Sequence, residues 1–301
     1  MKKRQISEEM KKDFLIGELK PLLEAVHEDD TLCLELRGNF TDIYYRGGTL
    51  YKIEDAQGIY KISIDENYLS DRAKNLLPII SASDAVDKIP CFKCEMDKWF
   101  HLHHKYEREY QQLILCENNN NKEIAHSSDY YIIDLEFADS EEKEDYRFDM
   151  IALKWPSTSV SRKDTNKPSL VLFENKYGDG ALGGNAGLKK HLDDFKVFLS
   201  NQSKVEELKN DMQAVFRQKC ELGLIAGLKE SQFNVKLSSE VPEVVFILAN
   251  HDPESKKLKS IICGVDESEY EFPILFAESS LMGYGLYETR MKTLEDIRKA
   301  L

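Results

Sequence analysis

Two apolar runs near the middle of the chain decide which fold the sequence predicts. They are Arg147-Phe148-Asp149-Met150-Ile151-Ala152-Leu153 and Ser169-Leu170-Val171-Leu172-Phe173-Glu174-Asn175-Lys176. Both are typical of buried β-strands, and each contains a carboxylate that needs a partner because an unpaired buried charge is costly. Lys176 lies two residues beyond Glu174, so strand alternation places both side chains on one face. Two carboxylates and an ammonium at one spot can bind a hard divalent ion and orient a water beside it.

The segments around these two runs predict a layered α/β core. A helix is expected over about 97–117, then strands over 130–137, 147–155 and 169–176, helices over about 186–200 and 204–222, and buried strands at 244–249 and 272–276. The first three strands have short connections, which indicates an antiparallel meander. The later strands follow helices and are expected to add in a mixed manner.

Residues 1–85 predict a small α+β unit in front of this core. Ser7 is an N-cap candidate for a helix over 7–28, and Pro21 favours two shorter pieces. Three strand candidates with glycine-containing turns follow, as expected of a helix backed by a β-meander. The chain is therefore divided into an amino-terminal domain, 1–85, with a candidate recognition or interaction role, and a second domain, 86–301.

The composition limits the classes of protein that need to be considered. The chain has 301 residues, 42% of them hydrophobic, which suffices for one large domain or two ordinary ones. No stretch approaches the roughly 20 apolar residues that cross a bilayer, so a soluble, cytoplasmic protein without a membrane partner is expected. The net charge of −13 counts against broad electrostatic affinity for nucleic acid but permits an enzyme with a focused site.

The order of these elements resembles the PD-(D/E)xK phosphodiesterase superfamily, the restriction-endonuclease-like nucleases. The residues that carry the resemblance are Asp149, on a strand hairpin, and Glu174-Asn175-Lys176, on the next strand, with a helix before and after. Phe148 stands where the motif has its proline, but the acid and not the proline binds metal. The resemblance covers roughly residues 95–285. It implies a restriction-endonuclease-like core with a central mixed sheet flanked by helices.

The resemblance also implies a role for each of these residues. Asp149 and Glu174 would bind Mg²⁺ (or Mn²⁺) with the backbone carbonyl of Asn175, and Lys176 would position the attacking water and stabilise charge on the phosphate. The implied activity is Mg²⁺-dependent hydrolysis of nucleic acid, with DNA as the expected partner, in host defence or repair. Many enzymes of this type act as dimers, so a homodimer is one expected assembly.

Further residues are candidates for the same site. Superfamily members often add an acid from the preceding helix, where Glu107 and Glu109 flank the apolar face, and we favour Glu109. Glu136 is another candidate acid, although a strand-end charge beside the metal site is its more usual role. Lys190 and His191 lie in the helix that commonly contacts the site or the phosphate backbone. A plain amphipathic helix explains most of that helix's pattern.

Other interpretations of the sequence stay open. A catalytically silent restriction-endonuclease-like module that binds protein or nucleic acid would suit the net charge of −13. It would leave Asp149, Glu174 and Lys176 without a reason to converge. Hydrolysis of some other phosphate ester would use the same residues, and a chance occurrence of the motif is the remaining alternative in a chain that is 32% charged.

Overall fold

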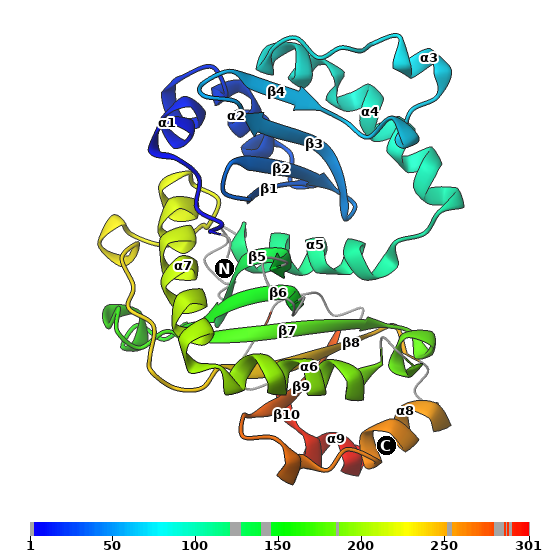
Figure 1. The fold of residues 1–301 in the computed structure, drawn as a ribbon, viewed down its shortest axis with the longest axis vertical. Helices are drawn as coiled ribbons and strands as arrows, with labels where there is room; N and C mark the ends of the chain where they lie inside the picture. The colour runs from blue at the N-terminus through cyan, green and yellow to red at the C-terminus, as the bar shows by residue number, and fades with distance from the viewer. Residues whose placement is uncertain are drawn as a thin grey trace.

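The protein has a mixed α/β fold with two sheets. The structure, a computed structural model, describes residues 3–120, 128–139, 146–184, 187–251, 255–279, 286, 288 and 291–300. One sheet has four antiparallel strands and the other has six strands of mixed direction. In Figure 1 the four-stranded sheet lies at the top with its helices, and the six-stranded sheet lies below it. None of the described helices is both long and apolar enough to span a membrane.

The first sheet is an antiparallel meander that follows two short helices. Its strands pair in chain order: β1 (Leu32–Leu36), β2 (Phe40–Tyr45), β3 (Gly48–Asp55) and β4 (Tyr60–Ser63). The helices are α1 (Glu8–Ile16) and α2 (Lys20–Glu28), separate pieces as Pro21 suggested. The Ser7 side chain caps α1 by accepting the Met10 N–H at 3.1 Å. The expected helix-plus-meander arrangement is therefore present, but with four strands instead of three, because the single strand expected over 42–53 is β2 and β3 joined by a tight turn.

The helices that cover this sheet continue beyond residue 85. After α3 (Asp71–Lys74), α4 runs from Ala82 to Leu102 with Ser81 as its N-cap. The Tyr51 hydroxyl of β3 donates to the Ala85 carbonyl at 2.7 Å, and the Tyr51 ring meets Phe92 edge-on. The boundary expected at residue 85 thus falls inside a helix that belongs to the amino-terminal unit. Pro90 lies within α4, although proline usually breaks a helix.

The single helix expected over 97–117 is two helices in the structure. α4 ends at Leu102 and α5 spans Tyr106–Asn119. His103 lies in the interruption, where it is exposed and its ring stacks on Trp99. Apolar periodicity does not detect so short an interruption, because the spacing on each side of it stays helical.

The second sheet combines the expected meander with later strands. Its order is β10-β9-β8-β7-β6-β5. The strands are β5 (Tyr130–Asp139), β6 (Tyr146–Lys154), β7 (Ser169–Tyr177), β8 (Glu243–Ala249), β9 (Ile274–Ser279) and β10 (Lys292–Thr293). β5, β6 and β7 pair antiparallel, whereas β8 joins β7 and β9 joins β8 in parallel.

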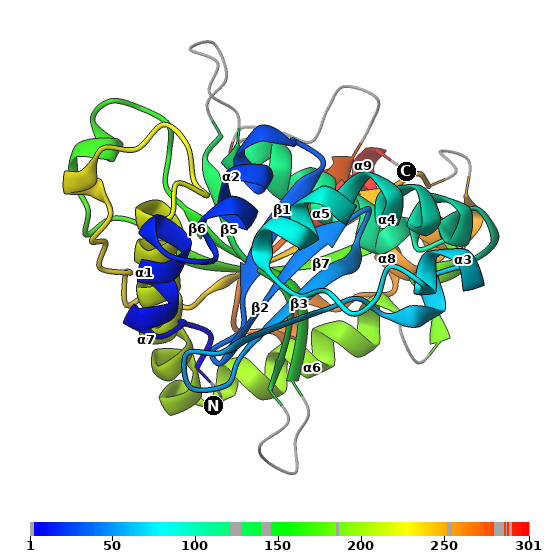
Figure 2. The ribbon, with the colours of Figure 1, turned by 90° about the horizontal axis from the view of Figure 1, so that it is seen from above.

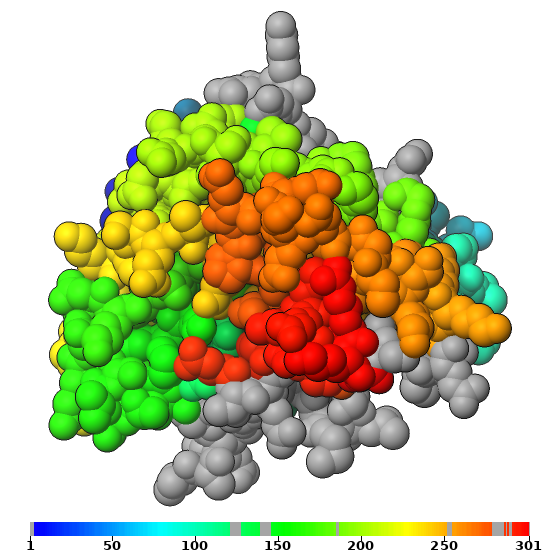
Figure 3. Space-filling model, turned by 90° about the horizontal axis from the view of Figure 1, so that it is seen from below, coloured from blue at the N-terminus to red at the C-terminus, as the bar shows by residue number. Residues whose placement is uncertain are grey.

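Helices cover both faces of the second sheet. α5 lies on one face, where Ile114 packs with Met150 and Phe173. α6 (Leu188–Ser200) and α7 (Gln202–Glu221) lie on the other, where Phe195 stacks on Phe148. Seen from above, the first sheet lies over this core (Figure 2). On the face seen from below, the carboxyl-terminal part, with α8 (Lys256–Cys263) and α9 (Leu294–Ala300), covers much of the surface (Figure 3).

Candidate active site

The predicted acid and lysine residues lie together where the pairing of β7 with β6 stops, while β7 stays paired with β8. β6 and β7 pair up to Met150 and Phe173, so Asp149 and Glu174 are the next residues in register. Glu174 pairs with Phe246 of β8, whose ring meets Phe195 of α6 edge-on. Glu174 therefore faces α6, and Lys176 faces the same way. This end of β7 lies beside the first turn of α5 and the connection to α4 (Figure 1).

Short contacts join these side chains. The Lys176 Nζ donates to the Glu174 Oε1 at 2.6 Å, and each side chain is only 3% exposed. The His191 Nε2 of α6 lies 3.1 Å from the same oxygen. The Asp149 Oδ2 accepts the backbone N–H of Asn175 at 2.7 Å. Strands β6 and β7 and helix α6 thus bring two carboxylates, an amine and an imidazole to one place.

Helix α5 contributes Glu107 to this cluster, and the preference for Glu109 needs correction. The Asn175 Nδ2 donates to the Glu107 carbonyl at 2.9 Å, which holds the start of α5 against the end of β7. Glu109 points to the amino-terminal unit instead, where its Oε1 accepts from the Arg46 Nε at 2.8 Å. Both acids flank the same apolar face, so only the partner from the distant β2–β3 turn distinguishes them.

Glu136 lies at the edge of the cluster. It stands between Leu135 and Phe137, which pair with Met150 and Phe148, so it is opposite Asp149. Its φ is 51°, in the left-handed region that non-glycine residues seldom adopt and that often marks a functional site. Its Oε2 lies 3.1 Å from the Arg108 Nη2. Glu136 is therefore a charge beside the site that is already held by a cation.

Lys190 is not brought into the cluster. Its amine pairs with Asp194, one turn further along α6, and both side chains are about half exposed. Neighbouring helix residues point about 100° apart, so His191 can face Glu174 while Lys190 faces solvent. The sequence suggested both residues, and the rotation of α6 against the sheet selects His191.

The carboxylates of the cluster are electrostatically crowded. Burial raises the pKa of Asp149 well above its usual range, and the charge of Glu174 adds to this effect. Burial raises the pKa of Glu174 to about 7, despite the opposing attraction of Lys176. Burial also raises the pKa of Glu107, again against the attraction of Lys176. The acids therefore favour a proton or an added cation, as acids of functional sites often do.

The donor atoms suit a hard divalent ion. The carboxylates of Asp149 and Glu174 and the Asn175 carbonyl are oxygen ligands of the type that Mg²⁺ and Mn²⁺ prefer. Within the described ranges, no three His, Cys, Asp or Glu side chains stand close enough to form a ready-made cage. An ion bound here would thus use two carboxylates and take its other ligands from water or substrate, which is usual for Mg²⁺.

Comparisons with known proteins add nothing on function, so the function is inferred from the geometry of the site. No protein-family model, no curated protein and no solved structure matches the chain.

Proposed function

We propose that the chain is a metal-dependent phosphodiesterase that hydrolyses nucleic acid, with a restriction-endonuclease-like core made of α5, β5–β7, α6 and β8. The main support is the convergence of Asp149, near the beginning of β6, with Glu174 and Lys176, near the end of β7. The order of helix, three-stranded meander and helix is also the one that the resemblance implies.

Each residue has a task in this proposal. Asp149 and Glu174 hold the ion, and the Asn175 N–H fixes the Asp149 carboxylate so that its other oxygen is directed to a ligand. A bound Mg²⁺ supplies charge neutralisation and a coordinated water of lowered pKa. Lys176 orients the attacking water and stabilises the charge that develops on the phosphate. His191 holds Glu174 in position from α6.

Cleavage assays with matched variants test the proposal. We expect linear, circular or single-stranded DNA, or RNA, to be cut in the presence of Mg²⁺ or Mn²⁺. Asp149→Asn and Lys176→Ala should each reduce the rate at least about 100-fold. Lys189→Ala, which removes an exposed lysine of α6 that pairs with Glu269, should retain the wild-type cleavage rate. Thermal unfolding confirms that each variant is folded.

A negative result would also be decisive. If the folded wild-type protein cuts none of these substrates and calorimetry detects no binding of Mn²⁺, the proposed enzyme is wrong. A catalytically silent module would then be the better description of the same fold.

A further inference from the structure

Stacked aromatic rings begin at the residue that follows Lys176. The Tyr177 ring stacks on Tyr106, with centroids 4.9 Å apart and planes at 23°. Tyr106 stacks on His104, with centroids 4.8 Å apart and planes at 10°. Tyr110 meets Tyr177 edge-on at 5.1 Å. We call His104, Tyr106 and Tyr177 the aromatic stack.

The aromatic stack is exposed but firmly held. Tyr106 is 41% exposed, and His104 is exposed in the connection between α4 and α5. The Asn250 Nδ2 donates to the Tyr177 hydroxyl at 2.9 Å, and the Asn175 side chain holds the start of α5. Tyr106 is stacked by both His104 and Tyr177, so the interruption between α4 and α5 presents His104 as the exposed end of a preformed row.

We propose that the aromatic stack binds unpaired bases of the substrate, so that single-stranded nucleic acid is the preferred substrate class. The inference rests on the proposed function, because it names the substrate of that same site. Aromatic side chains bind single strands by stacking on bases, whose faces a duplex hides. Tyr177 points to the face of β7 opposite Lys176, towards α5, and the row continues to Tyr106, which precedes Glu107. The charge of Glu107 interacts with Lys176, so a base that stacks on the row belongs to a nucleotide near the scissile phosphate.

The distribution of charge favours the same substrate. A chain with a net charge of −13 gains little from a long phosphate backbone, whereas stacking does not depend on net charge. Cations are nevertheless present locally, since Lys105 before Tyr106 is exposed, and Arg108 after Glu107 is exposed and pairs with Glu136. Stacking with a few phosphate contacts is the usual way to hold a single strand.

Binding measured without cleavage tests this inference. Fluorescence anisotropy with the full chain in EDTA compares a labelled single-stranded oligonucleotide with its duplex. We expect the single strand to bind at least about 10-fold more tightly. Tyr106→Leu, which retains apolar contact with Tyr177, and His104→Ala should each weaken single-strand binding about 10-fold. Tyr106→Phe should retain the wild-type affinity for the single strand.

The matched control is Leu102→Ala, because Leu102 is 75% exposed beside the same connection and has no ring. It should leave single-strand affinity unchanged. Equal affinity for duplex and single strand, or undiminished single-strand binding by folded Tyr106→Leu and His104→Ala, would overturn the inference. If Tyr106→Leu does not fold, His104→Ala alone decides, because His104 lies in an exposed connection.

The experiment also separates this inference from the proposed function. Loss of single-strand binding in Tyr106→Leu, together with an absence of metal-dependent cleavage, would support the binding surface and reject the nuclease. Metal-dependent cleavage that prefers duplex and is insensitive to Tyr106→Leu would support the nuclease and reject the binding surface.

Discussion

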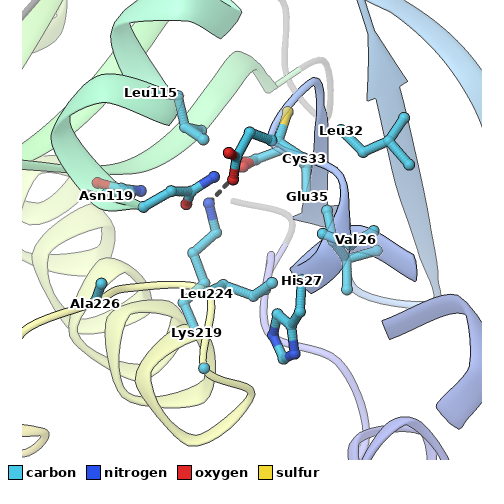
Figure 4. A pocket seen from close by; sticks show the side chains of 14 residues that line it. Val26, His27, Leu32, Cys33, Glu35, Leu115, Asn119, Lys219, Leu224 and Ala226 are labelled. Carbon is cyan, nitrogen blue, oxygen red and sulfur yellow. Dashed lines mark hydrogen bonds and ion pairs between the residues drawn. The ribbon is translucent and has the colours of Figure 1, made fainter. Parts of the chain in front are cut away.

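Two clusters of buried charge in this molecule differ in how their carboxylates are neutralised. In the first, Glu35 of β1 pairs with Lys219 of α7 at 2.5 Å, and Asp134 of β5 pairs with Arg37 and, at 3.3 Å, with Arg4. We call these five residues the junction cluster. Figure 4 shows Lys219 directed at Glu35, between α7 and β1. Each of its two carboxylates meets at least one cation.

The junction cluster joins the amino-terminal unit to the core. The Arg37 Nη2 also donates to the Leu135 carbonyl of β5 at 2.7 Å, and Glu35 accepts the Leu135 N–H at 3.2 Å. Burial raises the pKa of Glu35, but the charges of Lys219 and Arg37 oppose this. The cluster therefore satisfies its own charges and has a structural role.

The carboxylates at the end of β7 are not satisfied in this way. Among the described side chains, no Lys, Arg or His forms an ion pair with Asp149, which accepts a backbone N–H. Lys176 is the cation that serves Glu174, while Glu107 and Glu136 add further negative charge. Buried acids with matched cations thus indicate structure, whereas buried acids in excess indicate a place for a ligand.

The largest expected effect is on the junction cluster. Lys219→Met leaves Glu35 buried without its closest cation and should lower the free energy of unfolding by about 3–5 kcal/mol. Denaturant titration measures this. Lys299→Met, which removes an exposed lysine paired with Glu295, should cost less than about 1 kcal/mol. Adding Glu35→Gln should restore much of the loss, because Gln still accepts the Leu135 N–H. If Lys219→Met lowers the free energy of unfolding by less than about 1 kcal/mol, the junction cluster does not have the structural role that distinguishes it from the carboxylates at the end of β7.

The second effect is on catalysis by Lys176. Lys176→Met should reduce kcat about 100- to 1,000-fold, as expected for a group that stabilises charge in the transition state. It should destabilise the fold less than Lys219→Met, because Glu174, with a pKa of about 7, can take up a proton. Single-turnover cleavage and denaturant titration check both statements. A kcat within about 10-fold of wild type would assign Lys176 to structure alone.

The third effect is the pH dependence of stability. The Glu174 pKa is about 7 in the folded protein and near its ordinary value of 4.5 in the unfolded chain. Between these values the folded state retains a proton that the unfolded state has lost, so stability falls as the pH rises through this window. Without metal at pH 8, Glu174→Gln should therefore be more stable than wild type, by up to about 3 kcal/mol.

Thermal unfolding at several pH values measures this difference, which should shrink towards pH 4. Glu295→Gln, at an exposed position, is the matched control and should show no such trend. If Glu174→Gln is less stable than wild type at pH 8, the attraction of Lys176 for Glu174 outweighs the cost of burial. The site then does not hold an excess of unneutralised carboxylates.

The smallest effect distinguishes the two acids of α5. Glu107→Gln removes a charge beside the carboxylates and should weaken Mn²⁺ binding roughly 10-fold. Glu109→Gln, which loses its pairing with Arg46, should leave Mn²⁺ affinity unchanged. Calorimetric titration of both variants measures this. Equal weakening by the two substitutions would contradict the assignment of Glu107 to the site.

Local patterns predicted much of the fold but not its interruptions. Strand alternation around Asp149 and Glu174, the cap at Ser7 and the break at Pro21 each depend on a few neighbouring residues, and the structure shows all of them. The part of α4 before residue 97 was not expected, because it contains Pro90, and proline is usually a helix breaker although here it lies inside the helix. The interruption after Leu102 was missed because three residues do not change a helical repeat.

The sequence by itself determined that Glu174 and Lys176 share a face and that an apolar strand carries Asp149, because strand alternation is a local property. Only the tertiary structure decided that Glu107 rather than Glu109, and His191 rather than Lys190, faces them. These choices depend on the rotation of α5 and α6 against the sheet and on partners such as Arg46, 63 residues from Glu109. The sequence alone does not distinguish two polar side chains on the flank of one helix, because their surroundings depend on which distant part of the chain packs against each.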